Sequence, residues 1–247
     1  HYVAIIKGEI YKQIKDINIV DISNDITKFN IQEAAFVFKN CYKNFPEGTV
    51  HIIGINEELT NNNQHVAIQT NNQFIIGPDN GIFSLIFDEI DPDKIVQLNI
   101  PLDSDTLTFA IKDIFIKAAC HFIRGGTIEM IGSPLTDFQN KAASLKAVIS
   151  KDDIRGSVIH IDSYGNATSN ITKDLFNRVG KGRNFEILYG KETEKITKIV
   201  SKYKDVTQGE RLAIFSTNGN LEISMNQGKA NELLGLEIYD IIRIEFK

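Results

Sequence analysis

The hydrophobic pattern of the chain changes near residue 150, and this change constrains the fold more than any other feature. Before it, apolar residues spaced three and four apart alternate with strand-like runs. After it, short strand-like runs follow one another, separated by turns rich in Gly and Asn. Alternating strands and helices are typical of α/β layers, and closely spaced short strands are typical of antiparallel β domains. We therefore predict an N-terminal α/β domain with a central sheet over residues 1–150 and a smaller antiparallel β domain over residues 151–247, which meet in the polar stretch 149–153.

The first half carries signals for both helices and strands. Helical spacing predicts long helices over residues 3–14, 31–41 and 113–124. Strand-like runs cover residues 17–22, 49–55, 66–68, 74–76 and 95–100. Asn71-Asn72 fits a tight hairpin between two of these strands, because Asn tolerates a positive φ. A turn at residues 77–81 leads into a short helix ending at Glu89, which Asp79 or Asn80 would cap.

The second half is dominated by strand signals. Strands are expected over residues 158–161, 185–189, 212–216, 221–224 and 238–246. Asn218-Gly219, between the third and the fourth of these, is a strong hairpin signal. One short helix, over residues 229–234, is expected to interrupt the strands.

Composition argues against several classes of protein. The 247 residues are 42% hydrophobic and 24% charged, as in a soluble globular chain. A net charge of −5 provides no basic field for a phosphate backbone, so we expect no nucleic-acid partner. No apolar run reaches the roughly 18 residues of a membrane span, so we expect no membrane partner. The chain opens with His1-Tyr2 and shows no signal peptide, so the expected location is cytoplasmic.

Cysteine and histidine usage points away from disulfide and metal chemistry. Cys41 and Cys120 each lie in an apolar helical pattern, and we expect both to be reduced core residues. The five histidines show none of the spacings of a metal site, so we expect no bound metal.

The densest polar cluster spans residues 162–170, directly after an expected strand. Tyr164 offers a stacking face, Asn166 can pair with a base edge, and Asp162 can neutralise an ammonium. This set suits a purine nucleoside that carries a cation. The alternative is a turn in which Asp and Asn side chains satisfy their own backbone. The residues alone leave both interpretations open.

Two other polar segments are typical of structural roles. Residues 77–84 form a turn that leads into a helix. In residues 108–121, Asp113 is a candidate helix cap, and His121 is more typical of a satisfied core histidine than of a catalyst.

Taken together and in order, these segments resemble the family of S-adenosylmethionine hydroxide adenosyltransferases, relatives of the S-adenosylmethionine-dependent fluorinase and chlorinase. The likeness covers essentially the whole chain. It rests on residues 2–8 (YVAIIKG), 20–23 (VDIS), 29–35 (FNIQEAA), 45–51 (FPEGTVH), 77–81 (GPDNG), 108–115 (TFAIKDIF), 162–170 (DSYGNATSN) and 218–224 (NGNLEIS).

The resemblance implies a β-barrel-like C-terminal domain and a homotrimer. In the family, the ligand lies between the N-terminal domain of one subunit and the C-terminal domain of its neighbour. Members displace methionine from the 5′ carbon of S-adenosylmethionine with water or a halide. The resemblance therefore implies S-adenosylmethionine as substrate, adenosine and methionine as products, and no further cofactor.

The resemblance also assigns roles to residues of this chain. Asp162 falls where family members hold the amino group of methionine, and Tyr164 and Asn166 fall in the adenine pocket. Phe29 falls where an aromatic residue lines that pocket. The other substrate-binding positions implied are Asn56, Phe109, Thr217 and Asn218, the last two near the methionine carboxylate.

The chain departs from the family pattern in two places. The family's first strand ends in an Asp-Phe-Gly-like segment whose carboxylate binds the ribose hydroxyls, and by the resemblance this segment would lie upstream of His1. Water-using members also carry a catalytic Asp-Arg-His set, whose positions hold Asn56, Asn63 and Ala110 here. Halide-using members place a Ser where this chain has Ile111.

The chemistry of the reaction indicates what these departures cost. Methionine leaves as a neutral thioether and needs no acid, so the difficulty lies with the nucleophile. Positioned deprotonation of water typically contributes about 10²–10⁴-fold, and oriented, dry binding contributes separately. Asn56 can orient a water but cannot accept its proton; His65 and Lys112, nearby in sequence, are candidate substitutes.

A chain that has lost the deprotonation of water but keeps oriented, dry binding of the ligand fits two main hypotheses. The leading one is a slow S-adenosylmethionine hydrolase. The alternative is a non-catalytic adenosine- or S-adenosylmethionine-binding protein, and halogenation ranks third.

Overall fold

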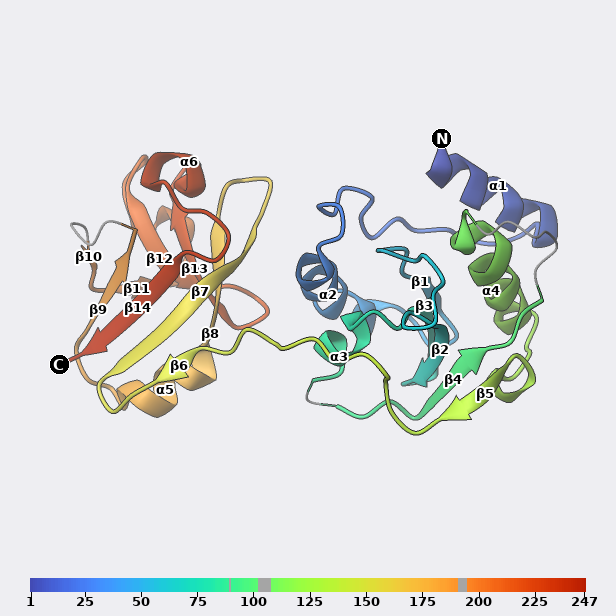
Figure 1. Ribbon diagram of the computed structural model, residues 1–247. Coiled ribbons are helices and arrows are strands. Elements are labelled where there is room, and N and C mark those ends of the chain that lie inside the picture. The colour runs from blue at the N-terminus through green and yellow to red at the C-terminus, as the bar shows by residue number, and fades with distance from the viewer. Residues whose placement is uncertain (89, 102–107, 191–194) are drawn as a thin grey trace. The chain divides into compact units, whose positions relative to one another are not determined.

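The computed structural model of the chain describes residues 1–88, 90–101, 108–190 and 195–247 (Figure 1). Two compact units are present, residues 1–144 and residues 145–247. Each unit has its own hydrophobic core. The second unit begins ahead of the polar stretch 149–153, because strand β6 (Val148–Ile149) pairs with β7 (Asp153–Ile161).

The first unit contains a mixed sheet of five strands among its described residues, in the order β1-β3-β2-β4-β5. The strands are β1 (Val50–Ile52), β2 (His65–Thr70), β3 (Gln73–Pro78), β4 (Lys94–Leu98) and β5 (Gly132–Leu135). Strand β1 runs parallel to β3, and the other described pairs are antiparallel. The predicted hairpin is confirmed: Asn71 and Asn72 have φ of +49° and +55° and join β2 to β3.

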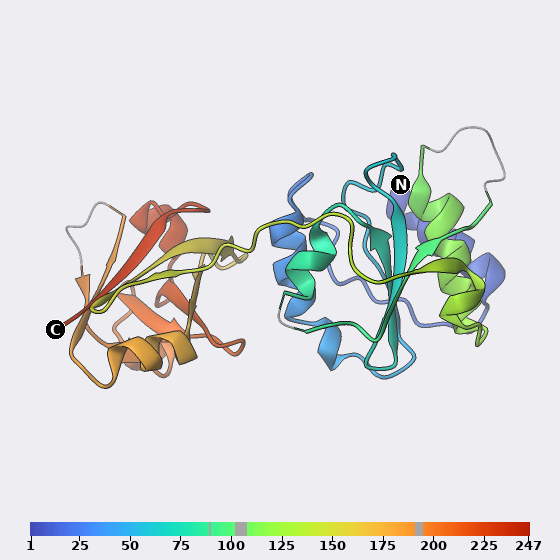
Figure 2. The same ribbon diagram turned by 60° about the horizontal axis from the view of Figure 1, so that its bottom comes forward.

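Helices lie on both sides of this sheet (Figure 2). One side packs against α2 (Ile31–Lys39) and α3 (Ile82–Ile86). The other packs against the π-helical turn η2 (Ile111–Phe115) and α4 (Ile116–Ile123), with α1 (Tyr2–Gln13) beside α4. Phe83 on the first side and Phe115 on the second are fully buried. Burying a ring of this size stabilises a fold by roughly 1.5–3 kcal/mol. The short turns η1 (Tyr42–Asn44) and η3 (Ile128–Met130) complete the unit.

Two strand predictions for this unit are wrong: one predicted strand is absent, and another is shorter than predicted. Residues 17–22 form no strand, because Ile17 and Ile19 pack into the small core between α1 and α4 and pair with no strand. The run 49–55 narrows to the three-residue β1, since the pairing with β3 ends with the hydrogen bond from Ile53 N to Ile76 O at 2.8 Å.

The predicted helix starts in this unit also shift. The third long helix begins at Ile111, so Asp113 lies inside its first turn and does not cap it. Helix α3 has Gly81 at its N-cap, and Asn80 Oδ1 accepts a hydrogen bond from Ile82 N at 3.2 Å. The predicted end of α3, Glu89, lies outside the described residues.

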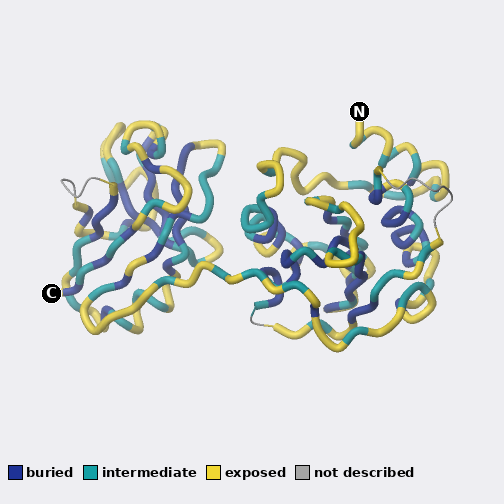
Figure 3. The backbone as a smooth tube through the Cα atoms, viewed as in Figure 1, coloured by how far each residue is buried: buried dark blue, intermediate teal, exposed yellow. Residues whose placement is uncertain are grey.

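The second unit is a nearly closed barrel whose described strand pairs are antiparallel except for the parallel pair β11 and β12. Its described strands follow the order β10-β9-β14-β7-β8-β13-β12-β11, and β10 also contacts β12. Buried and exposed residues alternate along several of these strands (Figure 3). The strands after β7 are β8 (Ala167–Thr172), β9 (Phe185–Tyr189), β10 (Lys195–Ile196), β11 (Ile199–Val200), β12 (Arg211–Phe215), β13 (Asn220–Met225) and β14 (Ile241–Phe246).

The prediction of a single helix in this unit is wrong. Besides α6 (Ala230–Leu234) and the turn η4 (Tyr203–Asp205), there is an α5 (Lys173–Gly180). Thr172 caps α5, because its Oγ1 accepts a hydrogen bond from Leu175 N at 3.2 Å. Leu175 and Phe176 pack against the barrel core.

Both cysteines are free thiols. Burial raises the pKa of Cys41 and of Cys120, which keeps both in the unreactive thiol form. None of the described helices has the length and apolar character needed to cross a bilayer.

Candidate functional site

The polar cluster at residues 162–170 consists of a tight turn followed by β8. Asp162 is half-buried, and its Oδ1 accepts hydrogen bonds from Tyr164 N and Asn166 N, both at 2.9 Å. Its Oδ2 accepts a hydrogen bond from Asn166 Nδ2 at 3.0 Å. Gly165 closes the turn with φ of +81°, where an added Cβ would collide with the backbone of Lys229. The interpretation as a turn that satisfies its own backbone is therefore confirmed, and the ligand interpretation stays a prediction.

Tyr164 and Asn166 present different chemistry at this turn. Tyr164 is 77% exposed, so its ring face is open to stacking. Asn166 is 7% exposed, and its amide nitrogen is occupied by Asp162. The amide oxygen of Asn166 is the atom left to read a donor on a base edge.

A second carboxylate lies on the same side of the barrel wall. Thr168 on β8 stands opposite Glu222 on β13, and side chains of directly paired residues share a face. Glu222 is 6% exposed, and its Oε1 accepts hydrogen bonds from Tyr203 Oη at 2.9 Å and Ser224 Oγ at 2.5 Å. Burial, this hydrogen bond and the charges of Glu222 and Asp162 raise the pKa of Tyr203 to about 12. Tyr203 is therefore a neutral donor that closes over Glu222.

Glu222 and Ser224 belong to the family motif at residues 218–224, but neither has a role assigned by the resemblance. The signal that would have found them is the alternation of residues 221–224, which puts both polar side chains on one face of a strand. Tyr203 has no such signal in the sequence, because it lies in η4 and contacts Glu222 only through the tertiary packing of that turn.

Thr217 and Asn218 are both exposed in the turn between β12 and β13. This turn adjoins the end of β8, where Asn220 pairs with Thr172, whereas the Asp162 turn adjoins its start. Asn218 Oδ1 accepts hydrogen bonds from Ser216 Oγ at 2.5 Å and Asn220 N at 3.0 Å. The two turns are not adjacent within the unit.

In the first unit, the loop between β1 and β2 brings Asn56 and Asn63 together. Asn63 Nδ2 donates hydrogen bonds to the carbonyl oxygens of Asn56 at 3.0 Å and Glu58 at 2.8 Å. Asn56 is exposed and takes φ of +52°. The Oδ1 atom of Asn63 is buried, and no described residue donates a hydrogen bond to it.

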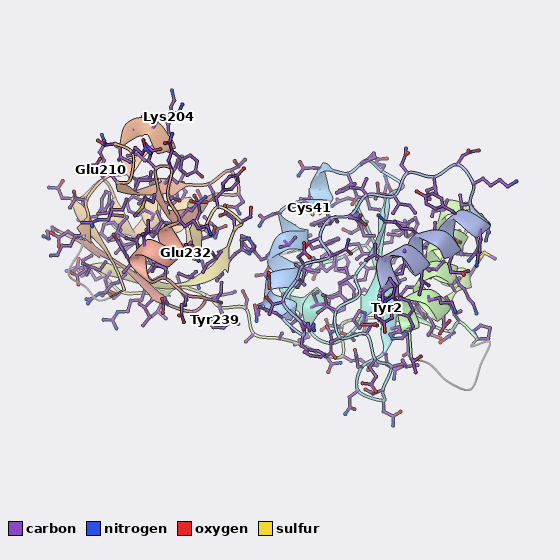
Figure 4. The ribbon with its side chains drawn as sticks, turned by 90° about the horizontal axis from the view of Figure 1, so that it is seen from above. Tyr2, Cys41, Lys204, Glu210, Glu232 and Tyr239 are labelled. Atoms are coloured by element: carbon purple, nitrogen blue, oxygen red, sulfur yellow. The ribbon has the colours of Figure 1, made fainter. Side chains whose placement is uncertain are left out.

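The third position of the family's catalytic set lies at a helix start. Ala110 is 2% exposed and forms the N-cap of η2. The half-buried Phe109 before it contacts Tyr2, labelled in Figure 4, edge-on at 5.1 Å between ring centroids. A methyl group at Ala110 provides neither a proton acceptor nor a donor.

Phe29 is held in an uncommon conformation just ahead of α2. Its φ is +66°, in the left-handed region, and its side chain is 75% exposed. A bulky residue in that region costs of order 1–3 kcal/mol, and such strain clusters at functional sites. An exposed aromatic ring with a strained backbone is consistent with the predicted role in lining a pocket.

Two histidines are buried on opposite faces of the first sheet. His65, at the start of β2, is 2% exposed, lies edge-on to Phe115 and places Nε2 at 2.8 Å from Glu57 O. His51, in β1, is 5% exposed and places Nε2 at 3.2 Å from Gln73 Oε1. Burial lowers the pKa of both imidazoles, so both are neutral at pH 7.

Because Glu57 O can only accept, the proton of His65 is on Nε2. Its Nδ1 is then a lone-pair acceptor. That atom is buried and has no hydrogen-bond partner among the described residues.

Asp79 is the buried polar residue of the turn at residues 77–81. It is fully buried, and its Oδ2 accepts a hydrogen bond from Gln139 N at 2.7 Å. Burial raises the pKa of this carboxyl group. Asn140 Nδ2 donates to Asp79 O, so the turn anchors the segment that follows β5. The structural interpretation of this motif is confirmed.

The first unit also contains a cavity of about 530 Å³. It is lined mainly by apolar side chains from α1, residues 17–24, α2 and β1. None of the predicted site residues lines it, although Ile55 and Ile111, the chain neighbours of Asn56 and Ala110, do. Among the described residues, no group of His, Cys, Asp and Glu side chains is arranged to hold a metal ion.

Comparison with known proteins decides the family. A family model for the SAM hydroxide adenosyltransferase N-terminal domain matches residues 1–132, and one for the C-terminal domain matches residues 156–243. The chain belongs to the SAM hydroxide adenosyltransferase family. The resemblance inferred from the motifs is thereby confirmed.

Two curated relatives of this family member are each named (R)-S-adenosyl-L-methionine hydrolase. The protein of Methanocaldococcus jannaschii is 26% identical over 251 residues, which cover 98% of this chain and 90% of that protein. The protein of Thermus thermophilus is 26% identical over 247 residues, which cover 96% and 91%.

Solved structures share the family fold. An uncharacterized conserved protein from Thermotoga maritima matches with a TM-score of 0.89 and 26% identity, covering 99% of this chain and 95% of that one. A conserved hypothetical protein from Thermus thermophilus matches with a TM-score of 0.75 and 22% identity over 98% and 93%, and shows the fold alone. The predicted fold class, an α/β domain followed by a barrel-like β domain, is confirmed.

Proposed function

We propose that the protein hydrolyses S-adenosyl-L-methionine to adenosine and L-methionine. The observation that carries the proposal is the turn at Asp162, which joins a fixed carboxylate, an open Tyr164 ring and the buried Asn166 amide. Family membership supports it, since relatives aligned over 98% and 96% of this chain are named (R)-S-adenosyl-L-methionine hydrolases. By the same likeness we propose the (R) sulfonium epimer as substrate.

The reaction is a single displacement. Water attacks the 5′ carbon, the O–C5′ bond forms and the C5′–S bond breaks. The electron pair of the broken bond returns to sulfur, which turns the sulfonium into the neutral thioether of methionine. The attacking oxygen must also lose a proton, and this proton is the one that the enzyme has to handle.

We assign the ligand contacts as follows. Asp162 pairs with the ammonium group, Tyr164 stacks on adenine, and Asn166 reads the base edge. Phe29 lines the adenine pocket, and the remaining proposed contacts are Asn56 and Phe109. Thr217 and Asn218 are not included, because their turn adjoins the opposite end of β8 from the Asp162 turn. Because Asp162 is satisfied by neutral N–H donors of its own turn, it keeps a full negative charge for a cation.

For the nucleophile, we propose that His65 accepts the proton. Asn63 Oδ1 and His65 Nδ1 are two buried acceptors, two residues apart along an extended chain, which places their side chains on one side. A water that donates to both would have its lone pair free to attack. His65 also faces the helix that begins after Ala110, since its ring contacts Phe115 of η2.

The test of this assignment is His65→Gln, because the Gln amide can still donate to Glu57 O while the basic nitrogen is lost. We expect kcat to fall by about 10²-fold or more, with KM within a few-fold. The acidic limb of the pH–kcat profile, where His65 becomes protonated, should disappear. His51→Gln is the matched control, because it alters an equally buried histidine on the other face of the sheet. Unchanged kcat in His65→Gln with the limb intact would exclude the assignment.

The hydrolase and its rival are separated by one experiment. S-adenosylmethionine is incubated with excess protein, and the mixture is resolved by chromatography. Adenosine and methionine formed in equal amounts, in proportion to protein, support the hydrolase. Unchanged ligand with measurable binding identifies the alternative, a non-catalytic adenosine- or S-adenosylmethionine-binding protein.

We further propose a homotrimer, with each site built from the first unit of one subunit and the second unit of its neighbour. Support comes from the family resemblance and from the division of the proposed contacts between the two units. Sedimentation at micromolar concentration should give a trimer, and a monomer that turns over substrate at that concentration would contradict the proposal.

A further inference from the structure

We propose that Glu222 is a specificity-determining residue that selects the positively charged sulfonium of the substrate over a neutral thioether. The inference rests on the proposed function and deepens it. It assigns a second anionic group to the cation-binding surface of the barrel.

Glu222 is a buried carboxylate with uncharged partners. It is 6% exposed, and its Oε1 accepts hydrogen bonds from the hydroxyl groups of Tyr203 and Ser224. Hydroxyl donors stabilise the anion but do not neutralise it. Among the described residues no Lys or Arg is within ion-pair distance of Glu222. Its charge therefore acts on its surroundings across a water-poor interior, where interactions between charges are stronger than in bulk water.

Strand register brings this charge next to the Asp162 turn. Ala167 pairs with Ile223, and Thr168 pairs with Glu222, so Glu222 lies on the same face as Thr168, one step along β8 from the turn. Both carboxylates also act on the Tyr203 hydroxyl, which places that hydroxyl within electrostatic reach of each.

The ligand has two positive centres to match. In S-adenosylmethionine a short carbon chain joins the ammonium to the sulfonium, so a ligand that pairs its ammonium with Asp162 brings its sulfonium close by. S-adenosylhomocysteine has the same ammonium and adenosine but a neutral sulfur. A negative charge near the sulfur therefore favours the first ligand and is indifferent to the second.

This role predicts a specific kinetic signature. The sulfonium charge disappears as the C5′–S bond breaks, so Glu222 stabilises the bound substrate at least as much as the transition state. Removing its charge should raise KM and leave kcat unchanged or slightly higher. The neutral sulfur of methionine should also be released more readily than the substrate.

The experiment uses Glu222→Gln in the otherwise unchanged protein. Gln has nearly the same shape, and its Oε1 can still accept from Tyr203 and Ser224. We expect the affinity for S-adenosylmethionine to fall roughly ten-fold, while that for S-adenosylhomocysteine stays within two-fold. Glu210→Gln is the control: Glu210, labelled in Figure 4, is exposed and accepts a hydrogen bond from Thr207 N, and its loss should change neither affinity.

The outcomes separate this inference from the proposed function. Equal affinity losses for both ligands, or a fall in kcat without a change in KM, would overturn the role of Glu222 and leave the hydrolase intact. A parent protein that binds neither ligand would refute the proposed function itself. If Glu222→Gln fails to fold, the two affinities of the unsubstituted protein are compared instead. We expect it to bind S-adenosylmethionine more tightly than S-adenosylhomocysteine. Equal affinities would refute the inference.

Discussion

Replacing Asp162 by Asn tests whether the turn after β7 is built only for the fold. The Asn side chain retains one oxygen, which can still accept from Tyr164 N and Asn166 N. Its new amide would face Asn166 Nδ2, donor against donor, so one hydrogen bond to a carboxylate, worth roughly 1.5–3 kcal/mol, is lost to the fold. That cost is too small to unfold a domain of ordinary stability.

The effect on ligand binding is similar in size, but it is selective for ligands that carry the ammonium group. A charge-assisted hydrogen bond to an ammonium is worth roughly 1.5–3 kcal/mol, which corresponds to about a ten- to hundred-fold loss of affinity. Isothermal titration with S-adenosylmethionine should show this loss, and titration with adenosine, which has no ammonium, should change by less than a few-fold. Asp240→Asn is a suitable control, since Asp240 Oδ2 also accepts a backbone N–H in a turn. If both ligands weaken equally in Asp162→Asn, Asp162 is only a turn residue.

Two further predictions concern the first unit. Restoring Asn56→Asp, Asn63→Arg and Ala110→His together should raise turnover at saturating ligand by about ten-fold or more while affinity stays within a few-fold, because the restored set would replace the pair Asn63 and His65 in handling water. Single changes should not raise turnover, because the three groups act as a unit and Asn63→Arg alone removes the Oδ1 acceptor. Initial rates of adenosine release measure this, and a folded, ligand-binding triple variant that is no faster would contradict it. The second prediction concerns the pH dependence of stability at Asp79. Burial raises the pKa of its carboxyl group in the folded state. Its contribution to the free energy of unfolding is therefore full at low pH and is lost as the pH rises through that pKa. Urea unfolding of the parent and Asp79→Asn across that range should show their difference in unfolding free energy changing with pH, and a constant difference would refute the reasoning.

The elements that sequence reasoning located well are those with strong local signals. The β2–β3 hairpin follows from Asn71-Asn72, because a two-residue turn needs positive φ and Asn accepts it. Helix α2 follows from the apolar spacing of residues 31–41. These signals are local, so no tertiary contact was needed to read them.

The errors have tertiary causes. Residues 17–22 alternate like a strand, but Ile17 and Ile19 bury themselves beside Ile10 and Cys120 and find no strand to pair with. Helix α5 was missed because it has only eight residues and its apolar positions are few, although Thr172 is a residue type that favours the N-cap. Short helices depend on packing more than on propensity, and packing is not visible in the sequence.

For the candidate site, the resemblance to family motifs assigned roles to residues, but it did not predict their hydrogen-bond partners. It named Asp162, yet the three donors that hold its carboxylate follow from the path of the turn. The unpartnered atoms of Asn63 and His65 likewise depend on how the loop after β1 closes over β2. Which polar atoms remain unpaired is a property of the whole fold.

The hydrogen bonds within the Asp162 turn have a thermodynamic consequence. Because Tyr164 N, Asn166 N and Asn166 Nδ2 already restrain the carboxylate without a ligand, its conformational entropy is spent during folding and not during binding. The receptor side of the ammonium contact is therefore preorganised, and the ordering cost of association falls on the flexible methionine chain of the ligand. A ligand with that chain rigidified in its bound shape would bind more tightly without making a single new contact.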